Sequence, residues 1–91
     1  MKIEHDTVAH RAYGLIEGQE AEVIYRLSDG GLDIVHTYVP TQLEGRGIAS
    51  QLVMFVYDYA LSQGWKLQAT CSYAKMWLKN NPVYQKYLLY D

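Results

Sequence analysis

The segment HTYVPTQLEGRGIASQLV holds the residues with the clearest chemical potential, because an arginine lies between two glycines where a helical pattern begins. These residues are Gly45, Arg46 and Gly47. The first turn of a helix carries unpaired N–H groups and a partial positive charge, and a guanidinium offers donors that fit phosphate oxygens. The segment therefore predicts an anion site, for which phosphate is the usual occupant.

The spacing in this loop differs from two common phosphate-binding motifs. No Lys-Ser or Lys-Thr pair follows Gly47, as a Walker loop requires, and the third glycine of a dinucleotide fingerprint is missing. Glycines before a helix can also serve only to form a tight corner. On the residues alone, the phosphate site and the simple corner are therefore both open.

Four side chains are candidates for nucleophilic or acid–base work. Cys71 ends a predicted strand just before a predicted helix, where the local field stabilises a thiolate; the alternative is a small buried hydrophobe. His36 lies on the strand that enters the loop and could serve as a general base, a common role of histidine, whereas the alternative is a hydrogen-bonded core residue. Tyr73 and Tyr84 are candidate proton donors to a departing thiolate, or packing residues. We expect no metal site, because no pair of histidines has ligand spacing with Cys71.

The elements that must position these residues begin with a β-meander. A polar turn at residues 17–20 and an Asp-Gly hairpin turn at residues 28–31 separate alternating apolar segments. We expect extended chain over residues 1–8, 11–17, 21–27 and 32–39. The last of these has apolar residues on both faces, as in a strand near the middle of a sheet.

Helical patterns dominate the second half of the chain. An apolar stripe of Ile48, Leu52, Phe55, Val56 and Tyr59 predicts one long helix that stops at residues 63–64. Residues 65–71 then form a strand, reached by a right-handed crossover and paired in parallel.

Two shorter helices are expected after that strand. One runs over residues 72–79 with Ser72 as its cap, and another begins after Asn81 with Pro82 at its first position and covers residues 83–90. The sequence thus predicts an α/β (α+β) fold, in which a mixed, mostly antiparallel sheet carries one long central helix and short C-terminal helices.

Length and composition indicate one small globular domain over residues 1–91. A net charge of −2 argues against general nucleic-acid binding, and no apolar run reaches the length of a membrane span. The single cysteine and the absence of a signal-peptide block at the start favour a cytoplasmic protein.

The loop resembles a known cofactor-binding motif. Val39-Pro40 followed by LEGRGIASQLV is similar to the coenzyme A loop of the GCN5-related N-acetyltransferases (GNAT), whose signature is Gln/Arg-x-x-Gly-x-Gly/Ala. Residues 42–47 satisfy it literally, whereas residues 44–49 fit the helix onset better and place Glu44 where the family has Gln or Arg. We favour the second register.

The resemblance is closer still to a small single-domain branch of that superfamily. HTYVP, GRGIA, CSYAKMWLKNNPVY and a tyrosine-bearing end occur in the same order, so the resemblance covers nearly the whole chain. Val83 follows the proline of the last motif, where this branch commonly has an acidic residue.

The resemblance implies coenzyme A or acetyl-CoA as cofactor, and it implies the residues that bind it. The pyrophosphate would lie on the amides of residues 45–49, the pantetheine beside the end of the strand before the loop, and the acyl group near Cys71. Asp33 would occupy roughly the strand position of the catalytic glutamate in larger members. The cofactor-binding residues so implied are Thr37, Tyr38, Val39, Gly45, Arg46, Gly47, Ile48, Ala49 and Asn81.

These residues lead to three hypotheses about function. The first is an acyl-CoA-dependent N-acyltransferase that moves an acetyl group to an amine of a small molecule or protein, either directly or through Cys71. The second is a non-catalytic CoA-binding or interaction module, in which a homodimer or protein partner completes a shortened acceptor site. The third, ranked last because it leaves the glycine loop unexplained, is a CoA-independent thiol enzyme that uses Cys71 with His36.

Overall fold

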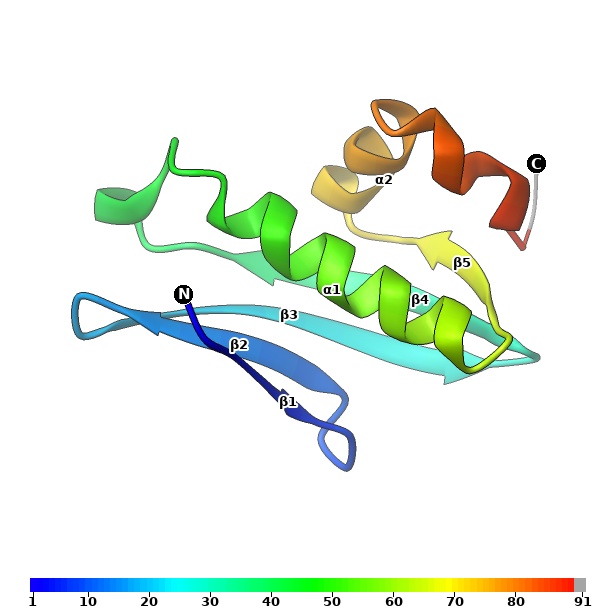
Figure 1. Ribbon diagram of the computed structural model, residues 1–91, viewed down its shortest axis with the longest axis horizontal. Coiled ribbons are helices and arrows are strands. Elements are labelled where there is room, and N and C mark those ends of the chain that lie inside the picture. Colours follow the sequence, from blue (N-terminus) through cyan, green and yellow to red (C-terminus); the bar gives the residue numbers. More distant parts are fainter. Residues whose placement is uncertain (90–91) are drawn as a thin grey trace.

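Five strands form one sheet in the order of the chain (Figure 1). The first four pair antiparallel, and the fifth pairs in parallel with the fourth after a helical crossover, as the sequence predicted. This computed structural model describes residues 1–89, so the last residue of the expected helix over residues 83–90 and the tyrosine at that end lie outside the described residues. The strands are β1 (Ile3–Asp6), β2 (Arg11–Ile16), β3 (Gln19–Ser28), β4 (Gly31–Tyr38) and β5 (Lys66–Ala69).

Two tight turns set the register of the meander. Asp29 and Gly30 join β3 to β4 with φ angles of 47° and 76°, and Glu17 and Gly18 join β2 to β3 with 51° and 77°. Two consecutive positive φ angles define the turn whose twist matches paired strands, which confirms the Asp-Gly hairpin. The first turn is shorter than predicted, because Gln19 already pairs with Ile16.

A bulge in β4 lies at the point where β4 and β5 stop pairing. Tyr25 on β3 pairs with Ile34, but its neighbour Ile24 pairs with His36, so Val35 is an extra residue. Such a bulge bends its strand and increases the local twist. The pairing of β4 with β5 ends at Ile34 and Ala69, while β4 continues over residues 35–38. The two strands therefore part at this point.

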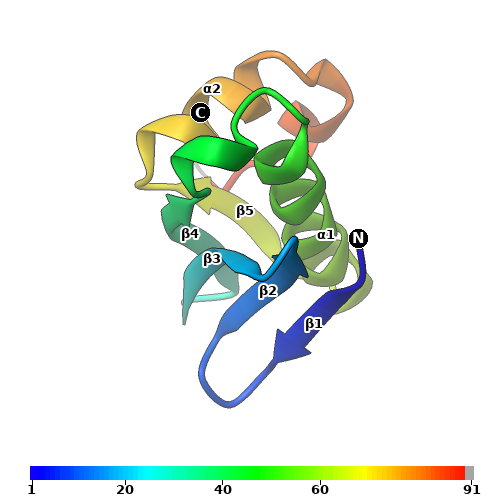
Figure 2. The same cartoon turned by 90° about the vertical axis from the view of Figure 1, so that its left-hand side faces the viewer.

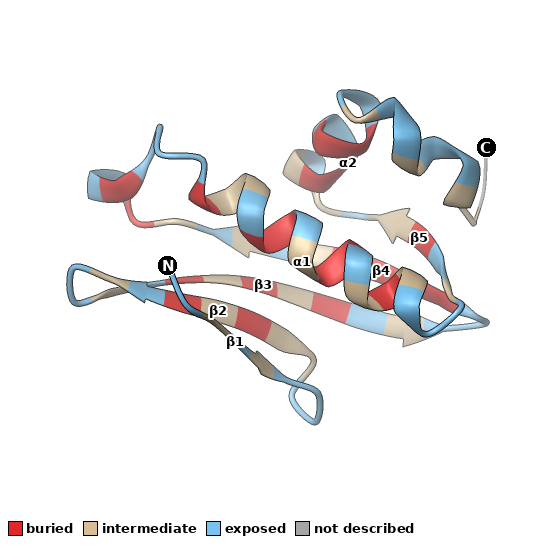
Figure 3. Ribbon diagram, in the orientation of Figure 1, coloured by how far each residue is buried: buried red, intermediate tan, exposed pale blue. Residues whose placement is uncertain are grey.

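Helix α1 (Ile48–Ser62) covers one face of the sheet and supplies much of the core (Figures 1 and 3). The predicted apolar stripe is only part of its buried surface, because α1 also packs against the C-terminal helices. Tyr57, which the stripe omitted, is fully buried and its hydroxyl donates to the Gln68 carbonyl on β5 at 2.7 Å. The buried residues of α1 are Ile48, Leu52, Val53, Val56, Tyr57 and Ala60.

No helix within residues 1–89 is long and apolar enough to cross a membrane.

The C-terminal helices differ in detail from the prediction. Helix α2 (Ser72–Lys79) has the predicted bounds, but its N-cap residue is Cys71 rather than Ser72. The segment after Asn81 is a 3-10 helix, η2 (Pro82–Tyr87), instead of a longer α-helix. This helix ends at Tyr87 because Leu88 is extended and pairs in parallel with Leu67 of β5.

The N-terminal histidines join an aromatic cluster that sequence reading missed. His5 Nε2 lies 2.8 Å from the Tyr25 hydroxyl, and its ring meets those of Phe55 and Tyr59 edge-on at 5.5 and 4.5 Å. The His10 ring stacks on Tyr25 at 5.2 Å. The cluster connects β1, β3 and α1, three elements that are distant in sequence, so no local pattern could reveal it.

Protonation of His5 should destabilise the fold. Burial lowers the pKa of His5 below the usual histidine value of about 6.5, against the opposing effect of Asp6. The unfolded chain therefore binds more protons below about pH 6.5, and the free energy of unfolding should fall as pH drops through the folded pKa. Urea denaturation at pH 7.5, 6.5 and 5.5 measures this slope, which His5→Phe should flatten. Tyr25→Phe keeps the burial and should retain most of the slope; an unchanged slope in His5→Phe would contradict the assignment.

Candidate functional site

A pocket of about 460 Å³ opens between the end of β4 and the start of α1. It lies where β4 has parted from β5, beside the loop that contains the short 3-10 helix η1 (Thr41–Leu43). Figure 2 shows this end of the molecule, with the loop beside the N-terminus of α1. The lining residues are Thr37, Tyr38, Val39, Leu43, Glu44, Gly45, Gly47, Ile48, Ala49 and Tyr73. Seven of the nine predicted cofactor-binding residues are thus brought together, and Arg46 and Asn81 are not among them.

The loop presents the open N-terminus of α1 to this pocket. Gly47 is the N-cap residue, with φ 75° and ψ 15°, and no side chain of the described residues caps the helix. Gly45 also has a positive φ, 83°. Both conformations disfavour L side chains, which explains the two glycines. The first amides of α1, at Ile48 and Ala49, therefore keep donors for an anion in the pocket.

The two predicted residues outside the lining make other contacts. The Arg46 guanidinium donates to the carboxylate of Glu17 in the β2–β3 turn. The Asn81 side-chain amide donates to the Trp77 carbonyl of α2 at 2.7 Å. Asn81 therefore ties η2 to α2, and Arg46 ties the loop to the first hairpin.

Cys71 lies next to the pocket, at the junction of β5 and α2. Its Sγ is 3.4 Å from Oγ1 of the pocket residue Thr37. Burial alone would raise the pKa of the thiol, but hydrogen bonding to Thr37 and the backbone amides of Ala74 and Tyr73 outweigh it, so the pKa is lowered. These two amides belong to the first turn of α2, the position that favours a thiolate.

The two candidate tyrosines lie in different places. Tyr73 lines the pocket; burial raises its pKa, and the Ser50 hydroxyl acts in the opposite direction. Tyr84 donates to the Asp58 carboxylate on α1 at 2.7 Å and packs against Trp77. Burial and Asp58 raise the pKa of Tyr84 to about 12. Of the two, only Tyr73 faces the pocket.

His36 is exposed, so its interpretation as a core histidine is wrong. It pairs with Ile24 of β3, whose neighbour Val23 is fully buried under α1, so His36 points to the opposite face. The next residue, Thr37, points back towards Cys71. The bulge thus places His36 and Cys71 on opposite faces of the sheet.

Within the described residues, no cluster of three His, Cys, Asp or Glu side chains forms a metal site.

Asp33 is a buried carboxylate that holds the β5–α2 junction. It is 5% exposed and accepts hydrogen bonds from the Thr70 amide at 2.7 Å and the Thr70 hydroxyl at 2.6 Å. Arg26 donates to it from β3 at 3.2 Å. Sequence reading associated Asp33 with a catalytic position, but could not foresee that its oxygens anchor the residue before Cys71.

Asp33 also lines a second cavity, of about 440 Å³, between β5 and the C-terminal helices. Apart from Asp33, its lining includes none of the predicted site residues. Its other lining residues are Leu67, Gln68, Ala69, Thr70, Lys75, Leu78, Lys79, Gln85 and Leu88.

The Thr37 hydroxyl should control the reactivity of Cys71. We expect the pH midpoint of iodoacetamide alkylation at Cys71 to lie below that of an ordinary thiol, because the thiolate accepts hydrogen bonds. Thr37→Val should move the midpoint upwards, and Thr37→Ser should restore it. Rates measured by mass spectrometry from pH 6 to 10 test this; an equal midpoint in the wild type and Thr37→Val would contradict it.

Comparison with known proteins gives concordant relatives. The GCN5-related N-acetyltransferase family model matches residues 11–87. The protein NATD1 of Xenopus tropicalis is 30% identical over 88 residues, covering 93% of this chain and 81% of NATD1, and human NATD1 is 30% identical with 93% and 78% covered. The solution structure of a GCN5-like protein from Staphylococcus aureus superposes with a TM-score of 0.76 and 32% identity, covering 97% of this chain and 87% of that one. The chain belongs to the GCN5-related N-acetyltransferase family.

Proposed function

We propose that this protein transfers an acetyl group from acetyl-CoA to an amine acceptor. The observation that supports this most is the pocket in which the uncapped N-terminus of α1 meets the part of β4 that extends beyond β5. Family membership supplies the class of reaction. The residues that line the pocket have groups that could bind acetyl-CoA, the donor substrate.

The lining suits the successive parts of acetyl-CoA. The amides of Gly47, Ile48 and Ala49 would hold the pyrophosphate, because oriented N–H groups and the helix dipole favour anions. Residues 35–38 of β4 extend past the end of β5, so their backbone groups offer partners to the pantetheine amides. Tyr73, at the first turn of α2, would lie near the thioester end.

The chemistry needs a nucleophile, a leaving group and two proton transfers. The acceptor nitrogen attacks the thioester carbonyl carbon, a C–N bond forms, and the C–S bond breaks. Tyr73 would give its proton to the departing sulfur, because a tyrosine hydroxyl is protonated at neutral pH and burial raises the pKa of Tyr73 further. The amine loses its extra proton to solvent or to an exposed base. In a two-step variant, the Cys71 thiolate would take the acetyl group first.

An acidic residue in the first turn of α1 should weaken acetyl-CoA binding without loss of stability. Ala49→Asp puts a carboxylate where the phosphates would lie, and we expect the Kd of acetyl-CoA to rise about ten-fold or more. The same carboxylate stabilises a helix N-terminus by about 0.3–1 kcal/mol, so the melting temperature should not fall.

Calorimetric titration of the wild type, Ala49→Asp and Gln51→Glu tests this prediction. Gln51→Glu adds the same charge to the same helix at an exposed position outside the pocket lining, and should change the Kd little. Absence of binding to the wild type would refute the proposed function. Equal weakening in both variants would mean that only net charge matters.

Removal of the Tyr73 hydroxyl should slow turnover and leave donor binding intact. A positioned general acid typically contributes about 100-fold or more to the rate, so we expect a loss in kcat of that order for Tyr73→Phe. CoA release in the presence of an amine found by screening peptides and polyamines measures it. Tyr84→Phe, whose hydroxyl contacts Asp58 instead, is the matched control. A larger loss in Tyr84→Phe would reverse the assignment.

Incubation with acetyl-CoA alone separates the two routes. Only the route through Cys71 leaves an acetyl group on the enzyme, which intact-mass spectrometry detects as a label that is absent in Cys71→Ala. Tight acetyl-CoA binding with no label and no acceptor-dependent CoA release would favour the non-catalytic binding module.

A further inference from the structure

Arg46, the cationic side chain between Gly45 and Gly47, pairs with a carboxylate from another part of the chain. Arg46 Nη1 donates to Glu17 Oε2, and the two side chains are 48% and 60% exposed. The pocket lining includes the two flanking glycines but not Arg46. The guanidinium therefore faces the β2–β3 turn, although its backbone amide belongs to the phosphate-binding loop.

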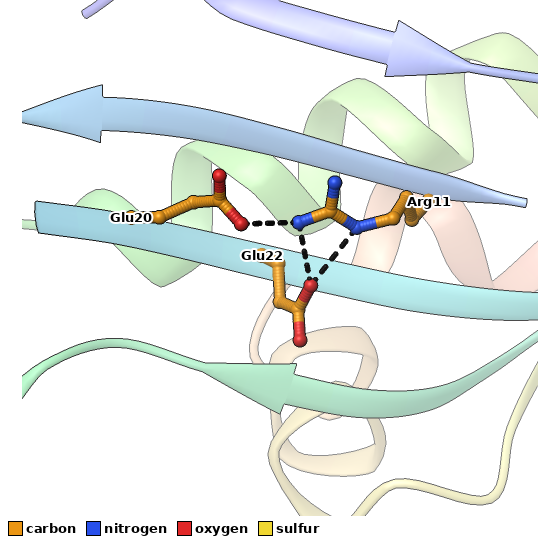
Figure 4. Close-up of polar contacts among 3 residues, drawn as sticks. All are labelled: Arg11, Glu20 and Glu22. Carbon is orange, nitrogen blue, oxygen red and sulfur yellow. Dashed lines mark hydrogen bonds and ion pairs between the residues drawn. The ribbon is translucent and has the colours of Figure 1, made fainter. Parts of the chain in front are cut away.

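Glu17 is held in place by the hairpin that carries it. Its φ of 51° is part of the turn, and the strands on either side are joined by Arg11, which donates to Glu22 through Nε and Nη2 at 2.9 and 2.7 Å (Figure 4). Arg11 Nη2 also contacts Glu20 at 2.5 Å. Figure 2 shows the turn and the loop at the same end of the molecule. The hairpin thus holds the backbone of the turn, and the exposed Glu17 carboxylate lies beside the Arg46 guanidinium.

We propose that Glu17 competes with the phosphates of the ligand for Arg46, and thereby sets the affinity of the pocket and its preference for phosphate-bearing ligands. This inference rests on the proposed function, because it assumes that acetyl-CoA binds at this loop. Binding exchanges one charge-assisted hydrogen bond for another: Arg46 leaves the Glu17 carboxylate and donates to a phosphate oxygen.

The geometry of the loop permits this exchange. Among the described residues, no heavy atom outside the adjacent ones lies within 4 Å of where a Cβ would stand at Gly45 or Gly47, so this side of the backbone is open at both glycines. The ion pair is exposed to solvent, and exposed pairs are weak. A phosphate group that is already bound to the α1 amides therefore needs little additional free energy to take over the guanidinium.

Substitution of Glu17 should therefore tighten binding. Without its competitor, Arg46 is free before the ligand arrives, and we expect the Kd of acetyl-CoA to fall about two- to five-fold in Glu17→Gln, the range of a weak exposed ion pair. A thioester that lacks phosphate, S-acetyl-pantetheine, should gain nothing. This difference between ligands is what a general effect on the fold would not produce.

The experiment is calorimetric titration of acetyl-CoA and S-acetyl-pantetheine into the wild type, Glu17→Gln, Glu20→Gln and Arg46→Ala. Glu20→Gln removes the same charge from the same hairpin, but its carboxylate contacts Arg11, so its effect on acetyl-CoA should be smaller than that of Glu17→Gln. A fifth protein, Glu17→Gln with Arg46→Ala, completes a double-mutant cycle. In the Arg46→Ala background, Glu17→Gln should no longer lower the Kd of acetyl-CoA, so the double variant should bind acetyl-CoA as Arg46→Ala does.

Each result decides the proposal. Tighter acetyl-CoA binding in Glu17→Gln that needs Arg46 supports competition. Unchanged or weaker binding in Glu17→Gln, or a gain equal to that of Glu20→Gln, overturns the proposal and leaves acetyl-CoA binding itself established. Absence of acetyl-CoA binding in the wild type and in Glu17→Gln overturns the proposal and the proposed function together.

Discussion

The candidate site depends on one constraint, the parting of β4 and β5 after Ile34 and Ala69. A bulge at Val35 increases the local twist of β4 at this point, and the amides of Thr70 and Cys71, just after β5, both donate to the Ile34 carbonyl. If the two strands stayed paired to their ends, the backbone of β4 would be occupied and no pocket would form beside it. The opening is thus built into the backbone.

Asp33 keeps that opening in a fixed shape. A buried carboxylate is costly unless it is hydrogen-bonded, and Asp33 meets this requirement by binding the amide and hydroxyl of Thr70 and the Arg26 side chain. These bonds fix the chain just before Cys71, so the thiol lies opposite Thr37 and the first turn of α2 is directed to the pocket. The hydrogen bonds that stabilise the buried Asp33 carboxylate therefore also help to position Cys71, the candidate nucleophile.

Local patterns predicted most of the fold. The Asp-Gly turn, the alternation in β3 and the apolar stripe of α1 each contain their own physical cause within a few residues, and all three were confirmed. The parallel pairing of β5 followed from the strand–helix–strand order of β4, α1 and β5. The resemblance to the coenzyme A loop named most of the pocket lining, which runs from the end of β4 through the loop to the start of α1.

The features that sequence reading missed are contacts between distant segments. The partner of Arg46 lies 29 residues away, on a turn whose residues carry no signal for that contact. The exposed side of His36 depends on the extra residue of a bulge, and one residue of shift inverts every side chain that follows. The end of η2 at Tyr87 depends on the pairing of Leu88 with Leu67, a contact between segments about 20 residues apart.

The most direct measurement is a titration of ¹⁵N-labelled protein with acetyl-CoA, followed by two-dimensional NMR. If acetyl-CoA occupies the pocket at the start of α1, the largest shifts should occur at the amides of residues 37–39, 45 and 47–49, because these line it. The amides of the Asp29–Gly30 turn at the far end of β4 should stay constant. Shifts centred on Thr70, Lys75 and Lys79 in the second cavity, or no shifts at millimolar ligand, would contradict the proposed site.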